Sequence, residues 1–180
     1  MGSYADDALF MSRNNIEYVE LISDDGKSKV MVIPAWQGRV MTTSAAGDEG
    51  DSYGWINYSF IKKRQIDLQF NPVGGEERFW LVPEGGVFSL YFRQGEKQIY
   101  KNWKVPPVLD IEAFKIQSQS KNCICLTKEG CLTNACGTTF YLNIKRTISL
   151  LDINEFAASF NLEFPKDIKA VAYKSDNQIT

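Results

Sequence analysis

Tyr141-Leu-Asn-Ile-Lys-Arg-Thr-Ile-Ser-Leu150 decides the fold class, because apolar and polar side chains alternate along it. A period of two is the pattern of a β-strand with one face on a core and the other toward solvent. We therefore expect one face to hold Leu142, Ile144, Arg146 and Ile148, and the other to hold Tyr141, Asn143, Lys145 and Thr147. Arg146 is the charged residue of the apolar set, so an ion pair or a sheet edge must accommodate it.

Strand signals continue on both sides of this stretch. Alternating runs separated by turn residues predict strands at 16–22, 28–33, 38–44, 87–92, 114–118, 122–128, 140–151 and 168–175. The first two are joined by Asp24-Asp25-Gly26 and should form a hairpin. Short helices are predicted at 4–13, within 55–64 and after a capping Asp152. The chain is therefore predicted to be all-β and antiparallel, with short helices.

The composition is that of one globular domain spanning residues 1–180. The chain is 44% hydrophobic and carries a formal net charge of -2. Its Lys and Arg residues are scattered, which argues against a nucleic-acid partner. No apolar run reaches the ~20 residues of a membrane helix, and Met1-Gly-Ser-Tyr-Ala-Asp-Asp7 lacks the regions of a signal peptide. We expect a soluble protein of either the cytoplasm or the periplasm.

Two residue types restrict the chemistry. Cys123, Cys125, Cys131 and Cys136 have the spacing C-x-C-x5-C-x4-C, whereas structural zinc sites use paired C-x2–4-C knuckles. Buried, unligated thiols are favoured over a metal site or a disulfide, and no cofactor is predicted. The chain contains no histidine. Its own residues therefore cannot build Ser-His-Asp or Cys-His catalysis or a histidine-ligated metal.

Asn71-Pro-Val-Gly-Gly-Glu-Glu-Arg-Phe-Trp-Leu-Val-Pro-Glu-Gly-Gly86 is the best candidate for a functional surface. Its glycine pairs predict tight turns or close backbone approaches, with a short strand between them. That strand places Arg78 and Trp80 on one face, where an indole can carry a sugar ring while the guanidinium and carboxylates bind hydroxyls. The alternative is structural, with Trp80 half-buried and Arg78 in a surface ion pair with Glu77.

Four stretches of the chain resemble a group of uncharacterised bacterial proteins of the galactose mutarotase-like (aldose 1-epimerase-like) superfamily. They are Val32-Ile-Pro-Ala-Trp-Gln-Gly-Arg-Val-Met41, Gly54-Trp-Ile-Asn57, Gly74-Gly-Glu-Glu-Arg-Phe-Trp80 with Pro83-Glu-Gly-Gly86, and Val171-Ala-Tyr-Lys-Ser-Asp-Asn177. The resemblance implies an antiparallel β-supersandwich whose concave sheet holds a carbohydrate. It also implies that this chain is the N-terminal portion of a longer supersandwich.

The chain departs from that superfamily in its chemistry. In the aldose 1-epimerases a histidine acts as general acid and a glutamate from the C-terminal part as general base. Histidine is absent here, so carboxylates would have to act, and Glu77 and Glu84 are the catalytic candidates.

The predicted ligand-binding residues are Arg39, Arg78, Trp80 and Glu84, followed by Trp55, Asn57 and Glu77. Some have structural alternatives, since Arg39 can cover a strand edge, Glu84 can be a turn residue and Trp55 can plug the sandwich. Two functions follow: a carbohydrate-binding protein related to aldose 1-epimerases, or an epimerase-type enzyme that uses carboxylates. The expected ligand is a sugar or an oligosaccharide. Exposed sheet edges also predict self-association.

Overall fold

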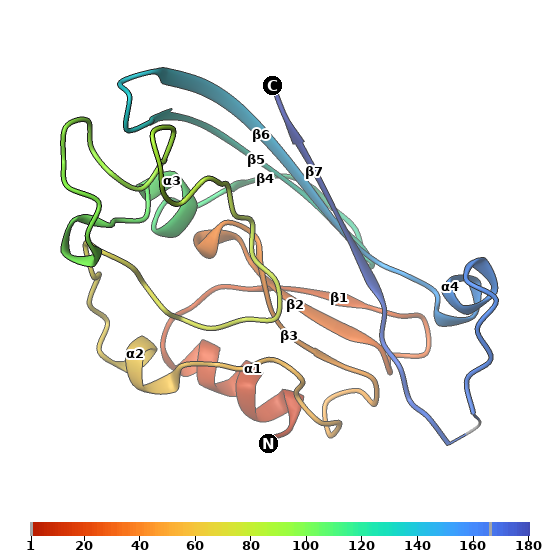
Figure 1. Ribbon diagram of the computed structural model, residues 1–180. Coiled ribbons are helices and arrows are strands. Elements are labelled where there is room, and N and C mark those ends of the chain that lie inside the picture. Colours follow the sequence, from red (N-terminus) through yellow and green to blue (C-terminus); the bar gives the residue numbers. More distant parts are fainter. Residues whose placement is uncertain (1, 166) are drawn as a thin grey trace.

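Two antiparallel sheets form the computed structural model, which describes residues 2–165 and 167–180 (Figure 1). The smaller sheet has the order β1-β2-β3 and consists of β1 (Val19–Ile22), β2 (Lys29–Ile33) and β3 (Arg39–Ser44). The larger sheet has the order β4-β5-β6-β7 and consists of β4 (Lys115–Gln119), β5 (Cys123–Thr133), β6 (Thr139–Leu150) and β7 (Tyr173–Ile179). In Figure 1 the larger sheet arches above the smaller one. The protein is a mainly β sandwich, as the alternating patterns predict.

The helices are short and lie outside the two sheets. They are α1 (Tyr4–Arg13), α2 (Tyr58–Lys62), α3 (Pro107–Asp110) and α4 (Ile153–Ser159), with 3-10 turns η1 (Pro34–Trp36) and η2 (Tyr100–Asn102). α1 begins where the sequence predicts, because Ser3 Oγ accepts from the Asp6 N–H at 3.2 Å and the Ser3 N–H donates to the Asp6 carboxylate at 3.0 Å. None of the helices in the described residues is long and apolar enough to cross a membrane.

Both faces of the smaller sheet are buried. Val30, Val32 and Val40 belong to the core that the two sheets share, whereas Met31 and Met41 belong to a second core with residues of α1 and α2. Successive residues of a strand point to opposite faces, so these continuous apolar runs serve two cores at once. α1 and α2 thus cover the face that the larger sheet leaves open.

β6 confirms the alternation that decides the fold class. Ile144, Arg146 and Ile148 are at most 1% exposed, whereas Lys145 between them is exposed. β6 pairs with β5 on one side and β7 on the other, and Arg146 lies opposite Leu126 of β5. The charged side chain is therefore in the interior of a sheet, and the predicted sheet-edge explanation is wrong.

The segment before β4 contains fewer strands than predicted. Residues 76–84 form no strand; their backbone pairs with β3 through an isolated bridge between Glu77 and Val40, and the Glu76 side chain accepts from Thr43 of β3. Residues 87–92 form turns, in which the Leu90 N–H donates to the Pro83 carbonyl at 3.1 Å. Local hydrogen bonds of this kind satisfy the backbone without a partner strand. The strand predicted at 87–92 is therefore absent, although the side chains alternate there as they would in a strand.

Two further predictions are revised. The last strand spans 173–179 rather than 168–175, because the pairing with β6 begins at residue 173. All four cysteines are free, but only Cys125 is buried. Cys131 lies on the outer face of β5, and Cys136 lies in the turn that leads to β6, so both are exposed.

Candidate functional site

Residues 71–86, called the Gly-Gly segment below, lie beside the free edge of β3. The Val40 N–H donates to the Glu77 carbonyl at 3.0 Å. Gly74 has a φ of +96°, and a Cβ there would collide with the carbonyl oxygen of Trp55. Only glycine combines this backbone conformation with so close an approach. The glycine pair therefore lets the segment pass between β3 and the chain around Trp55.

Arg146 fastens the Gly-Gly segment to the larger sheet. Its side chain is fully buried and forms an ion pair with Glu77. Its Nε donates to the Gly38 carbonyl at 3.2 Å, and its Nη1 donates to Asn177 Oδ1 at 2.7 Å and Ser175 Oγ at 3.4 Å. These partners come from three sequence stretches that are far apart in the chain. Each stretch thus supplies acceptors to the buried guanidinium of Arg146.

Arg39 is a second buried arginine at the same place. It is 3% exposed, and its Nη1 donates to the Gly74 carbonyl at 2.6 Å. Its Nε is buried without a hydrogen-bond partner among the described residues. Burial lowers the pKa of Arg39, and the nearby Arg78 cation adds to this effect, while Asp110 opposes it. The side chain is thus held in place as a poorly compensated cation.

Arg78 is the third arginine of this group, which is called the arginine cluster below (Arg39, Arg78 and Arg146), and it lies beside aromatic rings. Its Nη2 donates to the Leu109 carbonyl at 2.6 Å and lies 3.6 Å from Asp110 Oδ1. The centre of its guanidinium lies 3.9 Å above the Trp80 ring and 5.5 Å above the Phe70 ring. Burial lowers the pKa of Arg78, and Asp110 opposes that shift. The sequence prediction that Arg78 and Trp80 share one face agrees with this contact.

Trp80 holds other site residues in place and offers little open ring. Arg78 covers one part of the indole, and the Tyr91 ring packs against it with centroids 5.1 Å apart. The indole Nε1 donates to Glu84 Oε1 at 2.8 Å. Phe79, on the opposite side, is buried in the core. Trp80 thus orients Arg78 and Glu84.

Trp55 presents the open aromatic surface of the site. Its side chain is 65% exposed, which is unusual for tryptophan, and Tyr53 beside it is 48% exposed. Asn57 serves the backbone, because its side chain accepts from the Phe60 N–H at 3.1 Å and donates to the Pro72 carbonyl at 2.9 Å. Asn57 thereby caps α2 and fixes the start of the Gly-Gly segment. Trp55 neither plugs the sandwich nor belongs to either core.

Asp110 was not among the predicted site residues. Its Oδ2 accepts from the backbone N–H and the side-chain amide of Asn71, at 2.9 and 2.7 Å. Burial raises the pKa of Asp110, although Asn71 and Arg78 act in the other direction. Sequence reasoning had no signal for this residue, because Asp110 resembles an ordinary residue at the end of a short helix.

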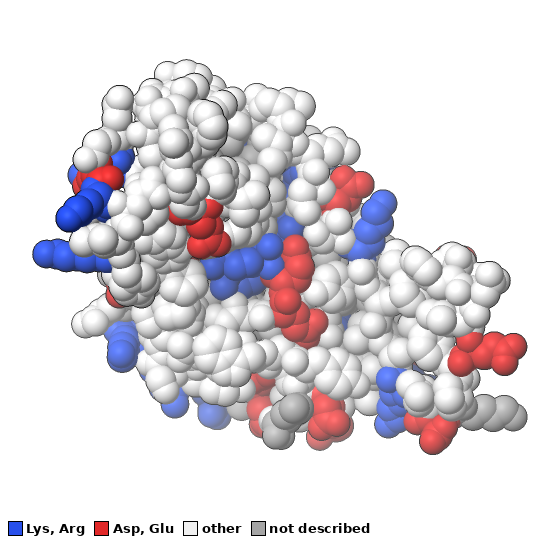
Figure 2. Space-filling view, viewed as in Figure 1, with Lys and Arg blue, Asp and Glu red and all other residues white. Residues whose placement is uncertain are grey.

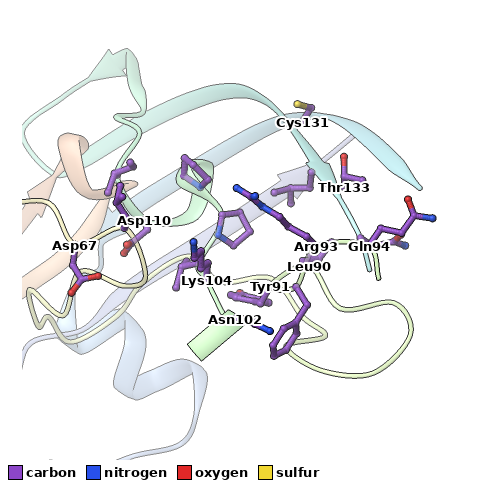
Figure 3. Close-up of a pocket in the computed structure, with 18 residues that line it drawn as sticks. Asp67, Leu90, Tyr91, Arg93, Gln94, Asn102, Lys104, Asp110, Cys131 and Thr133 are labelled. Carbon is purple, nitrogen blue, oxygen red and sulfur yellow. The ribbon is translucent and has the colours of Figure 1, made fainter. Parts of the chain in front are cut away.

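Asp110 also borders a cavity of about 460 Å³, which the last residues of β5 help to line. Figure 3 shows Asp67 and Asp110 at one side of this cavity and Arg93 reaching toward its middle from the other. None of the predicted site residues lines it. The cavity adjoins the arginines through Asp110, which lies beside Arg78, and through Tyr91, which packs on Trp80.

The chemistry available at the arginine cluster is that of hydrogen-bonding donors and carboxylates. Glu77 is engaged by Arg146, Glu84 by Trp80, and Asp110 by Asn71. Within residues 2–165 and 167–180, no three acidic or cysteine side chains are grouped so that they could hold a metal ion. The arrangement is suited to recognising a polar ligand with several hydroxyl or anionic groups.

The comparisons with known proteins identify a family. Residues 2–180 match the model of a family described as "Family of unknown function (DUF6786)". The match covers nearly all of the chain, so the protein belongs to that family. Neither a curated protein nor a solved structure matches it.

Proposed function

We propose that this protein binds carbohydrate and is related to the aldose 1-epimerases, with its sandwich forming part of a supersandwich. One observation carries the proposal. The four stretches behind that resemblance, which lie between residues 32 and 177, meet around Arg146, Arg39 and Gly74. A buried polar network costs desolvation free energy, so one built from distant stretches favours a functional role. Here the network holds the backbone beside the exposed indole of Trp55.

The proposed sugar site lies where Trp55 and Arg39 flank Gly74. The Gly74 carbonyl accepts from Arg39, and a Cβ added to Gly74 would lie 3.1 Å from Trp55 Cε3. The C–H face of a pyranose can lie on the exposed indole, because this contact removes apolar surface of both groups from water. The arginine donors and the exposed Glu84 then bind the ring hydroxyls. Arg78 and Tyr91 pack on Trp80, so in this proposal Trp55 rather than Trp80 stacks on the sugar ring.

Titration calorimetry with D-glucose, D-galactose and their disaccharides tests this proposal. We expect saturable binding that Trp55→Ala weakens by about 10-fold, which corresponds to about 1.4 kcal/mol. Tyr141→Ala is the matched control, because Tyr141 is 83% exposed but lies on the outer face of β6. Equal losses in both variants, or no binding of any sugar, would contradict the proposal.

An epimerase-type activity is the second candidate, and Asp110 is the observation that favours it. This carboxyl is buried beside Arg78, and burial raises its pKa, which suits an acid more than a surface carboxylate does. Polarimetry of freshly dissolved α-D-galactose measures such an activity. A rate above the spontaneous one that is lost in Asp110→Asn but kept in Glu96→Gln supports catalysis, and an unchanged rate rejects it.

A further inference from the structure

The arginine cluster of Arg39, Arg78 and Arg146 holds more positive than negative charge. Glu77 pairs with Arg146, and Asp110 lies 3.6 Å from Arg78. Within the described part of the chain Arg39 forms no ion pair, and its one side-chain hydrogen bond there goes to the neutral Gly74 carbonyl. Three guanidinium groups therefore face two carboxylates. Buried charges normally have compensation, so one anion is missing from this cluster.

The other nearby carboxylates are already engaged elsewhere. Glu76 accepts from the Thr43 N–H at 2.6 Å and from the Thr43 hydroxyl at 3.0 Å. Glu84 accepts from the Trp80 indole at 2.8 Å. Glu76 cannot move to Arg39 without leaving the buried Thr43 donors unsatisfied, and Glu84 is an exposed side chain held at the Trp80 indole. The missing anion is thus not supplied by a simple side-chain rotation.

The cluster also retains free donors. Arg39 uses Nη1 and Arg78 uses Nη2 for carbonyl oxygens, and the second amino group of each makes no hydrogen bond within the described residues. These second amino groups are not among the buried unpaired atoms, so they keep some contact with solvent. Figure 2 shows basic atoms directly beside acidic ones near the middle of one face of the molecule, below a lobe with little charge.

We propose that Arg39 and Arg78 bind the anionic group of an acidic saccharide, a carboxylate or a phosphate. This inference rests on the proposed carbohydrate binding and names the class of sugar. Planar guanidinium groups recognise carboxylate and phosphate oxygens through paired N–H donors. The ring of the same sugar lies toward Trp55, since Gly74 connects that indole to Arg39. The ligand thereby supplies the compensating charge that the cluster lacks.

Calorimetric titration of the whole chain with three probes tests the proposal. The probes are D-glucose, D-glucuronate and D-glucose 6-phosphate, compared at equal ionic strength. We expect at least one of the two anionic sugars to bind about 10-fold more tightly than glucose, and the better one identifies the anionic group. Raising the salt concentration should weaken this preference.

Variants at Arg39 localise the preference. Arg39→Lys keeps the positive charge but loses the planar guanidinium, and Arg39→Gln loses both. The preference for the acidic sugar over glucose should therefore fall in Arg39→Lys and fall further in Arg39→Gln. Arg93→Gln removes an exposed arginine outside the cluster and should leave the preference unchanged. Arg78→Lys provides a second readout if the Arg39 variants unfold in circular dichroism.

The outcomes separate the two proposals. Binding of glucose as tight as that of both acidic sugars would overturn anion recognition and leave carbohydrate binding intact. An anion preference that survives in Arg39→Gln and Arg78→Lys would also overturn it. If none of the three sugars binds, carbohydrate binding fails as well. A preference lost in the cluster variants and kept in Arg93→Gln supports the proposal.

Discussion

Glu77→Ala should destabilise the protein by about 3 kcal/mol. The substitution leaves Arg146, which is fully buried, without a carboxylate partner. Removing one partner of a buried ion pair costs roughly 3–5 kcal/mol, because the remaining charge stays desolvated. The Glu77 side chain is 29% exposed, so water can reach the vacated position. Asn177 and Ser175 also remain as acceptors. We therefore expect the lower end of that range.

Urea unfolding followed by tryptophan fluorescence measures this loss, with the slope of free energy against urea unchanged. Asp176→Ala is the matched control, because it breaks the exposed pair between Lys174 and Asp176, 3.6 Å apart, and should cost under about 1 kcal/mol. Glu77→Ala combined with Arg146→Met should recover much of the stability, since no buried charge is then left unpaired. Equal losses in Glu77→Ala and Asp176→Ala would show that Glu77 does not stabilise a buried charge on Arg146.

Three other predictions concern the free energy of unfolding. Burial raises the pKa of Asp110, so folding favours its protonated form. The resulting stabilisation is fully present at a pH below the pKa of an ordinary aspartate, and it is lost as the pH rises through the raised pKa of Asp110. Asp110→Asn should flatten that part of the melting temperature against pH, and an unchanged curve would contradict it. Gly74→Ala should cost about 2–4 kcal/mol in urea because its Cβ meets backbone, whereas Gly86→Ala, with a positive φ but open space, should cost only about 1 kcal/mol. Ser3→Ala should cost about 1 kcal/mol in thermal melts by removing the cap of α1, and a loss near zero would exclude that role.

The strands with neighbours on both sides were the most predictable part of the fold. Along β6 the burial of Ile144, Arg146 and Ile148 follows the period of two, because both flanking strands hold the backbone in a regular ladder. α1 was equally readable, since its start depends on a local interaction between Ser3 and Asp6. These features depend on pattern or on residues close in sequence.

Residues 87–92 show where pattern alone fails. They alternate like a strand, but Ser89 Oγ accepts from the Tyr91 N–H and donates to the Glu84 carbonyl, which favours turns. Among the described residues no strand pairs with this segment, and its Ser89 and Tyr91 carbonyls accept from the loop residues Ala135 and Lys104. The alternating residues Phe88 and Leu90 therefore do not belong to a paired β-strand.

The contacts between the candidate site residues could not be predicted from the sequence. Arg146 was conspicuous as a charge in an apolar row, but its partner Glu77 lies 69 residues away, and no local rule identifies it. Trp80 seemed the better stacking surface, yet Arg78 and Tyr91 pack on it and Trp55 carries the exposed ring. Which face of an indole is free depends on tertiary packing.

Nuclear magnetic resonance of the indole N–H groups tests the central claim most directly. The chain has four tryptophans, Trp36, Trp55, Trp80 and Trp103, and each should give one signal that a substitution can assign. On titration with D-glucuronate and D-galactose, we expect the Trp55 signal to shift most and the Trp80 signal to shift less, through Arg78. Shifts confined to Trp36 or Trp103, or no shift with any sugar, would contradict the claim that this face binds carbohydrate.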